Sequence, residues 1–166
     1  YPAAHNNLGL VLQEQGRYDE ALQSYHEAIR LKPTYVDAYN HLGVTLRQLG
    51  RYKEAAEAYT QALELQPNNF HFHCNLGFAY FSCENFQKAQ ACFERAIKLA
   101  PNNTIAHYSL GMAFSAQGQT NLGIQCYRNV LKFNPKDTGA LSALYRDLQQ
   151  RCSWDELEEL GRRLDC

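Results

Sequence analysis

Apolar residues recur along this chain at helical spacing, in pairs of stretches that are separated by short polar breaks. In residues 36–49 they fall three or four places apart, Gly50 and Arg51 interrupt the series, and residues 52–63 resume it. The positions that carry this pattern are Ala38, Tyr39, Leu42, Gly43, Leu46, Leu49, Tyr52, Ala55, Ala56, Tyr59, Ala62 and Leu63. The pattern predicts two helices joined by a tight turn.

The same hairpin pattern returns every 34 residues. A Leu-Gly pair occurs at residues 8–9, 42–43, 76–77 and 110–111, in equal steps of 34 residues. Small, aromatic and proline positions keep the same step, at Ala21, Ala55 and Ala89, at Tyr25, Tyr59, Phe93 and Tyr127, and at Pro33, Pro67, Pro101 and Pro135. We expect glycine and alanine to let the two helices approach, the aromatic ring to fill the space beside them, and proline to end the second helix. Asn-Asn after the proline suits a turn.

On these residues the chain resembles the tetratricopeptide repeat (TPR) family. The resemblance implies an all-α, right-handed α-solenoid of helix-turn-helix units, followed by C-terminal capping helices. The four units are residues 2–35, 36–69, 70–103 and 104–137, and residues 138–166 hold a capping helix and the start of a following segment. The place usually taken by an aromatic residue holds His5, Tyr39, His73 and His107. We therefore expect these histidines to pack between helices rather than to bind metal or transfer protons.

The fourth unit departs from the pattern, because Thr120 replaces the tyrosine of the turn and Gly123 replaces the alanine that packs between helices. A glycine inside a helix costs about 1 kcal/mol relative to alanine, so we expect this hairpin to be the loosest of the four. Residues 138–150 then repeat the pattern of a first helix, and we expect them to close the exposed end of the stack.

Both ends of the chain carry further predictions. Tyr1 has the phase of Tyr35, the last place of a unit, which predicts further repeats upstream. Ser153 followed by Glu156 forms a capping-box pattern and predicts a helix from Trp154. This segment is either a second capping helix or a junction, since its Cys-x-Trp-Asp sequence resembles the entry to the catalytic region of O-linked N-acetylglucosamine transferases and SPINDLY-type enzymes. That resemblance implies a sugar-nucleotide domain beyond Cys166.

Charge and cysteine spacing exclude several classes of function. The net charge is −1 without a basic run, which argues against nucleic acid and membrane surfaces as partners, and no apolar stretch is long enough to span a membrane. The six cysteines lie at least nine residues apart, which does not fit a metal site, so we expect reduced thiols in a cytoplasmic or nuclear protein. The sequence has no phosphate-binding loop or nucleophile motif. We expect no cofactor, no metal and no catalytic residue in this chain.

Function in a helical stack is predicted on the inward positions of the first helices, which line a concave groove. The candidate peptide-binding residues are Asn6, Asn7, Leu10, Asp37, Asn40, His41, Val44, Arg47, His71, Cys74, Asn75, Phe78, Tyr108, Ser109 and Met112. Within them, Asn7, His41, Asn75 and Ser109 share one phase and can all form hydrogen bonds. Carboxamides can pair with the main chain of an extended peptide, but solvated polar residues on a helix would give the same pattern.

The leading hypothesis is a module that binds a protein or an extended peptide in this groove, and the resemblance implies that it selects substrates for a linked O-glycosyltransferase. The first alternative is a structural scaffold that self-associates through its array ends or organises a complex. A second alternative, an adaptor for the acidic tails of chaperones, is less favoured. Arg47 is the only strongly basic candidate residue, and Leu10, His71 and Cys74 stand where such a clamp needs donors or charge.

Overall fold

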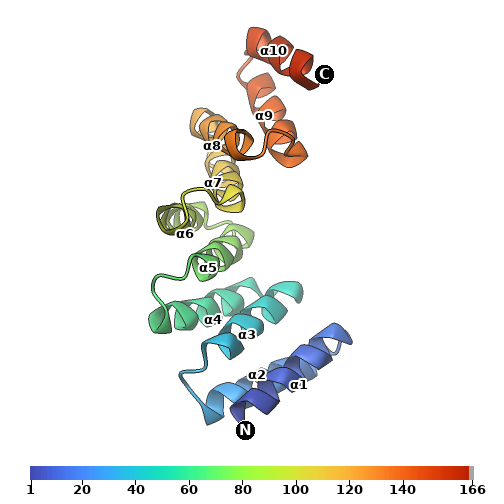
Figure 1. The fold of residues 1–166 in the computed structure, drawn as a ribbon, viewed down its shortest axis with the longest axis vertical. Coiled ribbons are helices and arrows are strands. Elements are labelled where there is room, and N and C mark those ends of the chain that lie inside the picture. Colours follow the sequence, from blue (N-terminus) through green and yellow to red (C-terminus); the bar gives the residue numbers. More distant parts are fainter. Residues whose placement is uncertain (165–166) are drawn as a thin grey trace. The chain divides into compact units, whose positions relative to one another are not determined.

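The computed structural model describes the backbone of residues 1–164, and throughout that range the regular structure is α-helix (Figure 1). In chain order the helices are α1 (Pro2–Glu14), α2 (Tyr18–Leu31), α3 (Val36–Gln48), α4 (Tyr52–Leu65), α5 (Phe70–Ser82), α6 (Phe86–Leu99), α7 (Thr104–Ala116), α8 (Thr120–Phe133), α9 (Thr138–Gln150) and α10 (Trp154–Leu164). None of these helices is long and apolar enough to cross a membrane.

The chain divides into two compact units, each with a core of its own. The N-terminal unit is Tyr1–Leu99 and contains α1 to α6, and the C-terminal unit is Ala100–Cys166 and contains α7 to α10. Consecutive helices pack as hairpins within each unit, and α2 and α4 also pack against α3 and α5. Each predicted repeat therefore holds one hairpin, with odd-numbered first helices and even-numbered second helices.

The glycine and the aromatic residue of each repeat form the centre of its hairpin. A Cβ atom on Gly43 would lie 2.7 Å from Cε1 of Tyr59, closer than side-chain atoms approach. Tyr59 is fully buried, so its ring packs directly on the glycine backbone. The same contact joins Gly9 to Tyr25, Gly77 to Phe93 and Gly111 to Tyr127. The predicted role of these two positions in hairpin packing is confirmed.

Residues around the proline tie each turn to the helix that follows. Asn69 and Asn103 are N-cap residues, and their side chains accept hydrogen bonds from the backbone N–H groups of His71 and Ala106. In the same phase, Asp137 caps α9. The second asparagine of the Asn-Asn pair thus starts a helix as well as completing a turn.

The histidines of repeats 3 and 4 have a structural role, as predicted. Nε2 of His73 lies 2.9 Å from the carbonyl oxygen of Pro67, and Nε2 of His107 lies 2.8 Å from that of Pro101. Because a carbonyl oxygen only accepts, each ring donates a hydrogen bond to the preceding turn.

Helices α9 and α10 form a fifth, divergent hairpin. The range of α9 matches the predicted first helix, and α10 starts at Trp154 as predicted. Cys152 has a φ of 57° at the place where Gly118, one period earlier, has a φ of 74°. Leu157, one period after Gly123, is buried. In the structure this segment forms a second helix that packs on the capping helix.

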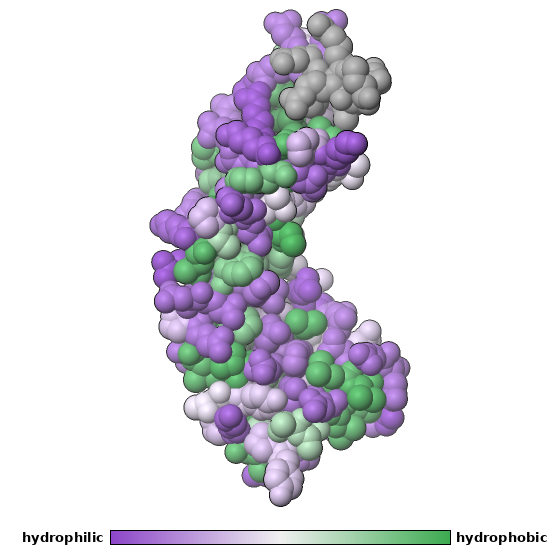
Figure 2. Space-filling view, in the orientation of Figure 1, coloured by the Kyte–Doolittle hydropathy of each residue, from purple (hydrophilic) through white to green (hydrophobic). Residues whose placement is uncertain are grey.

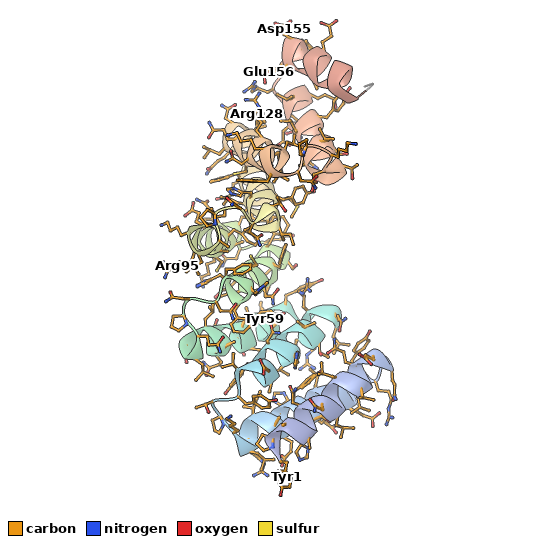
Figure 3. The ribbon with its side chains drawn as sticks, in the orientation of Figure 1. Tyr1, Tyr59, Arg95, Arg128, Asp155 and Glu156 are labelled. Atoms are coloured by element: carbon orange, nitrogen blue, oxygen red, sulfur yellow. The ribbon has the colours of Figure 1, made fainter. Side chains whose placement is uncertain are left out.

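The predicted capping box at the start of α10 is wrong. The Ser153 hydroxyl oxygen accepts a hydrogen bond from Nε of Arg151, 2.7 Å away. The Glu156 carboxylate pairs with Arg128 and Arg151, and Arg128 on α8 and Glu156 on α10 point toward each other in Figure 3. Arg151 therefore engages the side chains of both Ser153 and Glu156, and the ion pair between Arg128 and Glu156 links α10 to α8.

Candidate functional site

The candidate residues of the N-terminal unit lie on α1, α3 and α5, and we call the surface they form the first-helix face. Asn7, Asp37 and His71 are exposed, whereas Asn6 and Cys74 are buried. The partly buried members are Leu10, Asn40, His41, Val44, Arg47, Asn75 and Phe78. In the C-terminal unit, Tyr108 and Met112 are partly buried on α7, and Ser109 is buried. Asn6, Cys74 and Ser109 therefore offer little surface to a partner.

Polar side chains on the first-helix face bond to each other from one repeat to the next. Nδ1 of His41 lies 2.9 Å from Oδ1 of Asn6, and Nδ2 of Asn75 donates to Oδ1 of Asn40 at 3.2 Å. Both pairs join residues 35 apart, so they are equivalent hydrogen bonds, one between α1 and α3 and one between α3 and α5. We call each of these hydrogen-bonded pairs a rung. The repeat phase predicted Asn7, His41 and Asn75 as one column of polar residues, whereas each rung joins that column to the neighbouring column of Asn6 and Asn40. The signal was present in the neighbouring polar residues at 6–7 and 40–41.

These rungs leave defined hydrogen-bonding groups free. An amide oxygen only accepts, so Nδ1 of His41 carries the proton, and the neutral ring presents Nε2 as an acceptor. Burial lowers the pKa of His41 below its ordinary value of 6.5, against the opposing charge of Asp37. The ring is therefore neutral at pH 7. Asn75 uses its Nδ2 group in the rung, which leaves its Oδ1 as an acceptor.

Beneath this face, the first repeat contains a neutral polar cluster. The Tyr25 hydroxyl donates to Oε1 of Gln13 at 2.9 Å, and the Thr45 hydroxyl oxygen lies 2.9 Å from that oxygen and 2.9 Å from the carbonyl oxygen of His41. Tyr25 and Thr45 are fully buried. Gln13 thus joins the two helices of its own hairpin to α3, and a satisfied cluster of this kind fixes the packing of one repeat on the next.

The C-terminal unit contains the corresponding cluster with a buried carboxylate. Ser115, in the phase of Gln13, donates to Oδ2 of Asp147 at 2.5 Å, and its oxygen lies 3.3 Å from the Tyr127 hydroxyl. Asp147 is fully buried on α9 in the phase of Thr45. A Cβ atom on Gly123 would lie 2.4 Å from Oγ of Ser115, so the glycine makes room for this cluster. Asp147 was not among the predicted site residues, although a charged residue was a visible departure at a place otherwise held by Val11, Thr45, Ala79 and Ala113.

The second repeat has the same arrangement without the acceptor. Arg47 takes the place of Gln13, and Ala79 takes the place of Thr45. The hydroxyl of Tyr59 and Nε of Arg47 are both buried without a hydrogen-bond partner. Burial raises the pKa of Tyr59 to about 12, opposed by the positive charge of Arg47 and by the closeness of its guanidinium, a hydrogen-bond donor, to the hydroxyl oxygen. Tyr59 lies inside the N-terminal unit (Figure 3).

A pocket of about 720 Å³ lies on another side of the N-terminal unit, between α4 and the end of α5. Its lining residues are Lys53, Ala56, Glu57, Thr60, Gln61, Tyr80, Cys83 and Asn85. No candidate residue of the first-helix face lines it.

The thiols near the first-helix face are unreactive at neutral pH. Burial raises the pKa of Cys74 and of Cys92 to about 11, so both are protonated at neutral pH and are poor nucleophiles. Cys74 therefore contributes packing rather than chemistry.

Comparison with known proteins identifies the repeat. Three models of the tetratricopeptide repeat match residues 6–70, 72–103 and 92–125. No curated protein sequence matches the chain. A crystal structure of MamA has a TM-score of 0.92 at 22% identity, over 98% of this chain and 88% of that chain. YrrB, described as a TPR protein with an unusual peptide-binding site, has a TM-score of 0.77 at 23% identity, over 97% and 81% of the two chains.

PilF of Pseudomonas aeruginosa is a further match, with a TM-score of 0.82 at 18% identity over 98% of this chain and 74% of that chain. Identities at this level show the fold, and the predicted all-α TPR solenoid is confirmed. The matched repeat models and the shared fold together place this chain in the tetratricopeptide repeat family.

Proposed function

We propose that the first-helix face of the N-terminal unit binds an extended peptide segment of a partner protein. The observation that carries this proposal is the pair of equivalent rungs, Asn6 with His41 and Asn40 with Asn75. Each rung holds its side chains in place and leaves acceptors and donors that match the N–H and C=O groups of a peptide main chain. Such groups bind a main chain whatever its side chains are.

The spacing of the rungs supports an extended ligand. Neighbouring helices pack about 8 to 10 Å apart, and an extended chain advances about 3.3 Å per residue. Successive rungs would therefore meet about every third residue of the peptide. YrrB, which shares this fold, is described as having a peptide-binding site.

The test uses a displayed library of random twelve-residue peptides, followed by titration of the selected peptides against a double variant, Asn7→Ala with Asn75→Ala. We expect affinity to fall about tenfold, since each lost hydrogen bond is worth about 0.5 to 1.5 kcal/mol. The matched control is Gln23→Ala with Gln87→Ala, which removes two exposed amides from the second helices α2 and α6. Unchanged affinity in a double variant with an intact helical spectrum would contradict the proposal.

The finer form of this proposal makes the bound peptide a substrate of a linked O-glycosyltransferase. It rests on the resemblance of residues 152–160 alone. The sequence that follows Cys166 in the natural protein tests it: a sugar-nucleotide-binding domain there would support the substrate-arm function, and a different domain would overturn it.

The second candidate function is a scaffold that self-associates through the exposed end of α1. Leu8 is 50% exposed, whereas Leu42 and Leu76 in the same phase are 5% and 7% exposed beneath preceding hairpins. Val11 is also exposed, and Figure 2 shows hydrophobic surface at this end of the N-terminal unit. A hairpin from a second copy would cover this surface as α2 covers α3, and so would a preceding repeat of the same chain, which the phase of Tyr1 predicts.

Light scattering across a range of concentrations tests the scaffold function. Self-association predicts a mass that rises with concentration in the wild type and stays monomeric in Leu8→Lys. The control Leu65→Lys changes another exposed leucine and should behave as the wild type does. A monomer at every concentration would reject this candidate.

A further inference from the structure

We infer that the pocket between α4 and the end of α5 is a second binding site, which takes leucine-type side chains from an amphipathic helix of a partner protein. The inference goes beyond the proposed function, since none of the candidate residues of the first-helix face lines this pocket. All of its lining residues belong to the N-terminal unit. Its volume of about 720 Å³ lies within the range of about 300 to 1,000 Å³ that is usual for ligand sites.

The pocket is open because smaller residues replace two leucines. At the equivalent junction one period earlier, between α2 and the end of α3, Leu22 is only 5% exposed, and Leu49 is the C-cap residue of α3. At the pocket, Ala56 occupies the place of Leu22. Cys83, the C-cap residue of α5, occupies the place of Leu49. Both exchanges remove aliphatic volume, so the first junction shows which side chains suit this space.

Tyr80 forms a wall of the pocket and does not fill it. It occupies the place of Leu46, which is 3% exposed at the first junction, whereas Tyr80 is only partly buried and lines the pocket. Nζ of Lys88 lies 5.3 Å from the centre of the Tyr80 ring. An aromatic wall of this kind offers a large contact surface to an aliphatic side chain.

The rim of the pocket has free charges of both signs. Lys53 and Glu57 line it one turn apart on α4, and among the described residues no ion pair involves either of them. At the first junction, Asp19 interacts electrostatically with Arg51. Lys53 and Asn85 occupy these two places at the pocket, so that pair is lost. A partner that has an acidic residue near Lys53 and a basic residue near Glu57 would complement this rim.

A helix suits this pocket better than an extended strand does. The lining residues of α4 form one stripe about 12 Å long, and they are Lys53, Ala56, Glu57, Thr60 and Gln61. The Thr60 hydroxyl already donates to the carbonyl oxygen of Ala56, and Oδ1 of Asn85 accepts from the N–H group of Lys88. Few groups therefore remain to pair with the main chain of a strand. A helix satisfies its own main chain and places apolar residues three or four positions apart along such a stripe.

Selection from a displayed library of helical peptides tests the inference. The peptides are about 18 residues long and have a fixed Ala-rich frame with six randomised positions on one face. The wild-type chain should select Leu, Ile, Met or Phe at two positions three or four residues apart, with an acidic and a basic residue beside them. Selection of polar faces only, or of no helix, would overturn the inference.

A double variant that converts this junction into the first one tests the site. Ala56→Leu with Cys83→Leu supplies the missing side chains, so a selected helix should bind it about tenfold more weakly than the wild type. Its melting temperature should not fall, because filling a cavity adds packing contacts. The matched control, Gln23→Leu with Ala91→Leu, adds two leucines at exposed positions of α2 and α6 and should bind as the wild type does. Equal affinity of the filled variant, or a lower melting temperature that shows the space to be occupied already, would contradict the inference.

Cysteine labelling locates the bound helix in the unchanged chain. Cys83 is partly buried in the wall of the pocket, and Cys152 is exposed on the C-terminal unit. Iodoacetamide should label both in the free chain, and a saturating selected helix should slow the labelling of Cys83 about tenfold and leave that of Cys152 unchanged. A Cys83 that is unlabelled in the free chain, or labelled equally fast in the complex, would reject the pocket as the site.

The two binding proposals can fail independently. Asn7→Ala with Asn75→Ala should leave the affinity for the selected helix as it is in the wild type. The filled variant should likewise keep its affinity for the extended peptides that bind the first-helix face. A helix that loses affinity in the asparagine variant would lie on the first-helix face instead, and the inference of a second site would be wrong.

Discussion

The first and second repeats have the same hairpin packing and differ at one polar position of the first helix, Gln13 in the first repeat and Arg47 in the second. In both, a buried tyrosine packs on the glycine of the first helix. In the first repeat Gln13 accepts from Tyr25 and Thr45, and in the second Arg47 leaves Tyr59 unpaired. Both hairpins form, so their packing does not require the tyrosine hydroxyl to have a hydrogen-bond partner. In the first repeat this position links neighbouring helices, and in the second the buried hydroxyl of Tyr59 lies beside Arg47 without a side-chain acceptor.

The largest expected effect is in the C-terminal unit, where the same cluster contains a charge. Ser115→Ala removes the hydroxyl that donates to the buried Asp147 carboxylate. We expect a loss of about 2 to 3 kcal/mol in the free energy of unfolding, because hydrogen bonds to buried charges are strong. Urea unfolding measures the change in the free energy of unfolding. Hydrogen exchange should show that the lost protection lies in α7 to α9. The control is Ser142→Ala, at an exposed position on α9. A loss below about 0.5 kcal/mol would show that Asp147 does not depend on Ser115.

A matched pair of tyrosine variants tests the comparison between the first two repeats. Tyr25→Phe deletes a hydroxyl that donates to Gln13 and should cost about 1 kcal/mol. Tyr59→Phe deletes a hydroxyl without a partner and should cost nothing or stabilise the protein slightly. Phe93 already occupies the same position in the third repeat, so the ring fits without its hydroxyl. Equal losses in thermal unfolding would mean that the two repeats do not differ.

The sequence predicted the hairpins because their packing depends on residue types at fixed places. Glycine, alanine, an aromatic residue and proline recur with a period of 34, and helix boundaries follow from them. The fifth hairpin was only half predicted. Its second helix keeps the phase, but Cys152 replaces the turn glycine, Leu157 replaces alanine and Gly161 replaces the aromatic residue. Backbone conformation and burial preserve the repeat there after the residue types have changed.

The candidate site was less predictable, because hydrogen bonds between repeats depend on side-chain geometry. Phase alone placed Asn6, His41 and Asn75 on one face, and it could not show that Asn6 is buried or that His41 bonds to it. The missing acceptor beside Tyr59 is also invisible in a list of polar residues. The difference becomes visible only when the surroundings of the equivalent tyrosine hydroxyl are compared from repeat to repeat.

Arg47→Gln sharpens the comparison by giving the second repeat the residue of the first. The new amide oxygen can accept from the Tyr59 hydroxyl, and the buried unpaired Nε is removed. We expect the free energy of unfolding to rise by about 1 kcal/mol. Arg47→Ala serves as the control, since it removes the charge without supplying an acceptor and should not stabilise. A destabilised Arg47→Gln protein would assign Arg47 to the packing of the repeat instead.

The smallest expected effect is a pH dependence of the N-terminal unit. His41 bonds to Asn6 of α1, its ring lies 5.7 Å from that of Tyr25 on α2, and Asp37 precedes it by one turn on α3. Its pKa in the folded protein is lowered by burial, so the unfolded chain takes up a proton first as the pH falls. The stability that His41 contributes is present above pH 6.5 and declines below it. His41→Asn should therefore reduce the loss of unfolding free energy between about pH 7.5 and 5.5, because asparagine can donate to Asn6 and does not titrate. The control His26→Asn, on the exposed side of α2, should lose as much unfolding free energy over this pH range as the wild type does. Equal pH profiles for all three proteins would show that the rung at His41 is not sensitive to protonation.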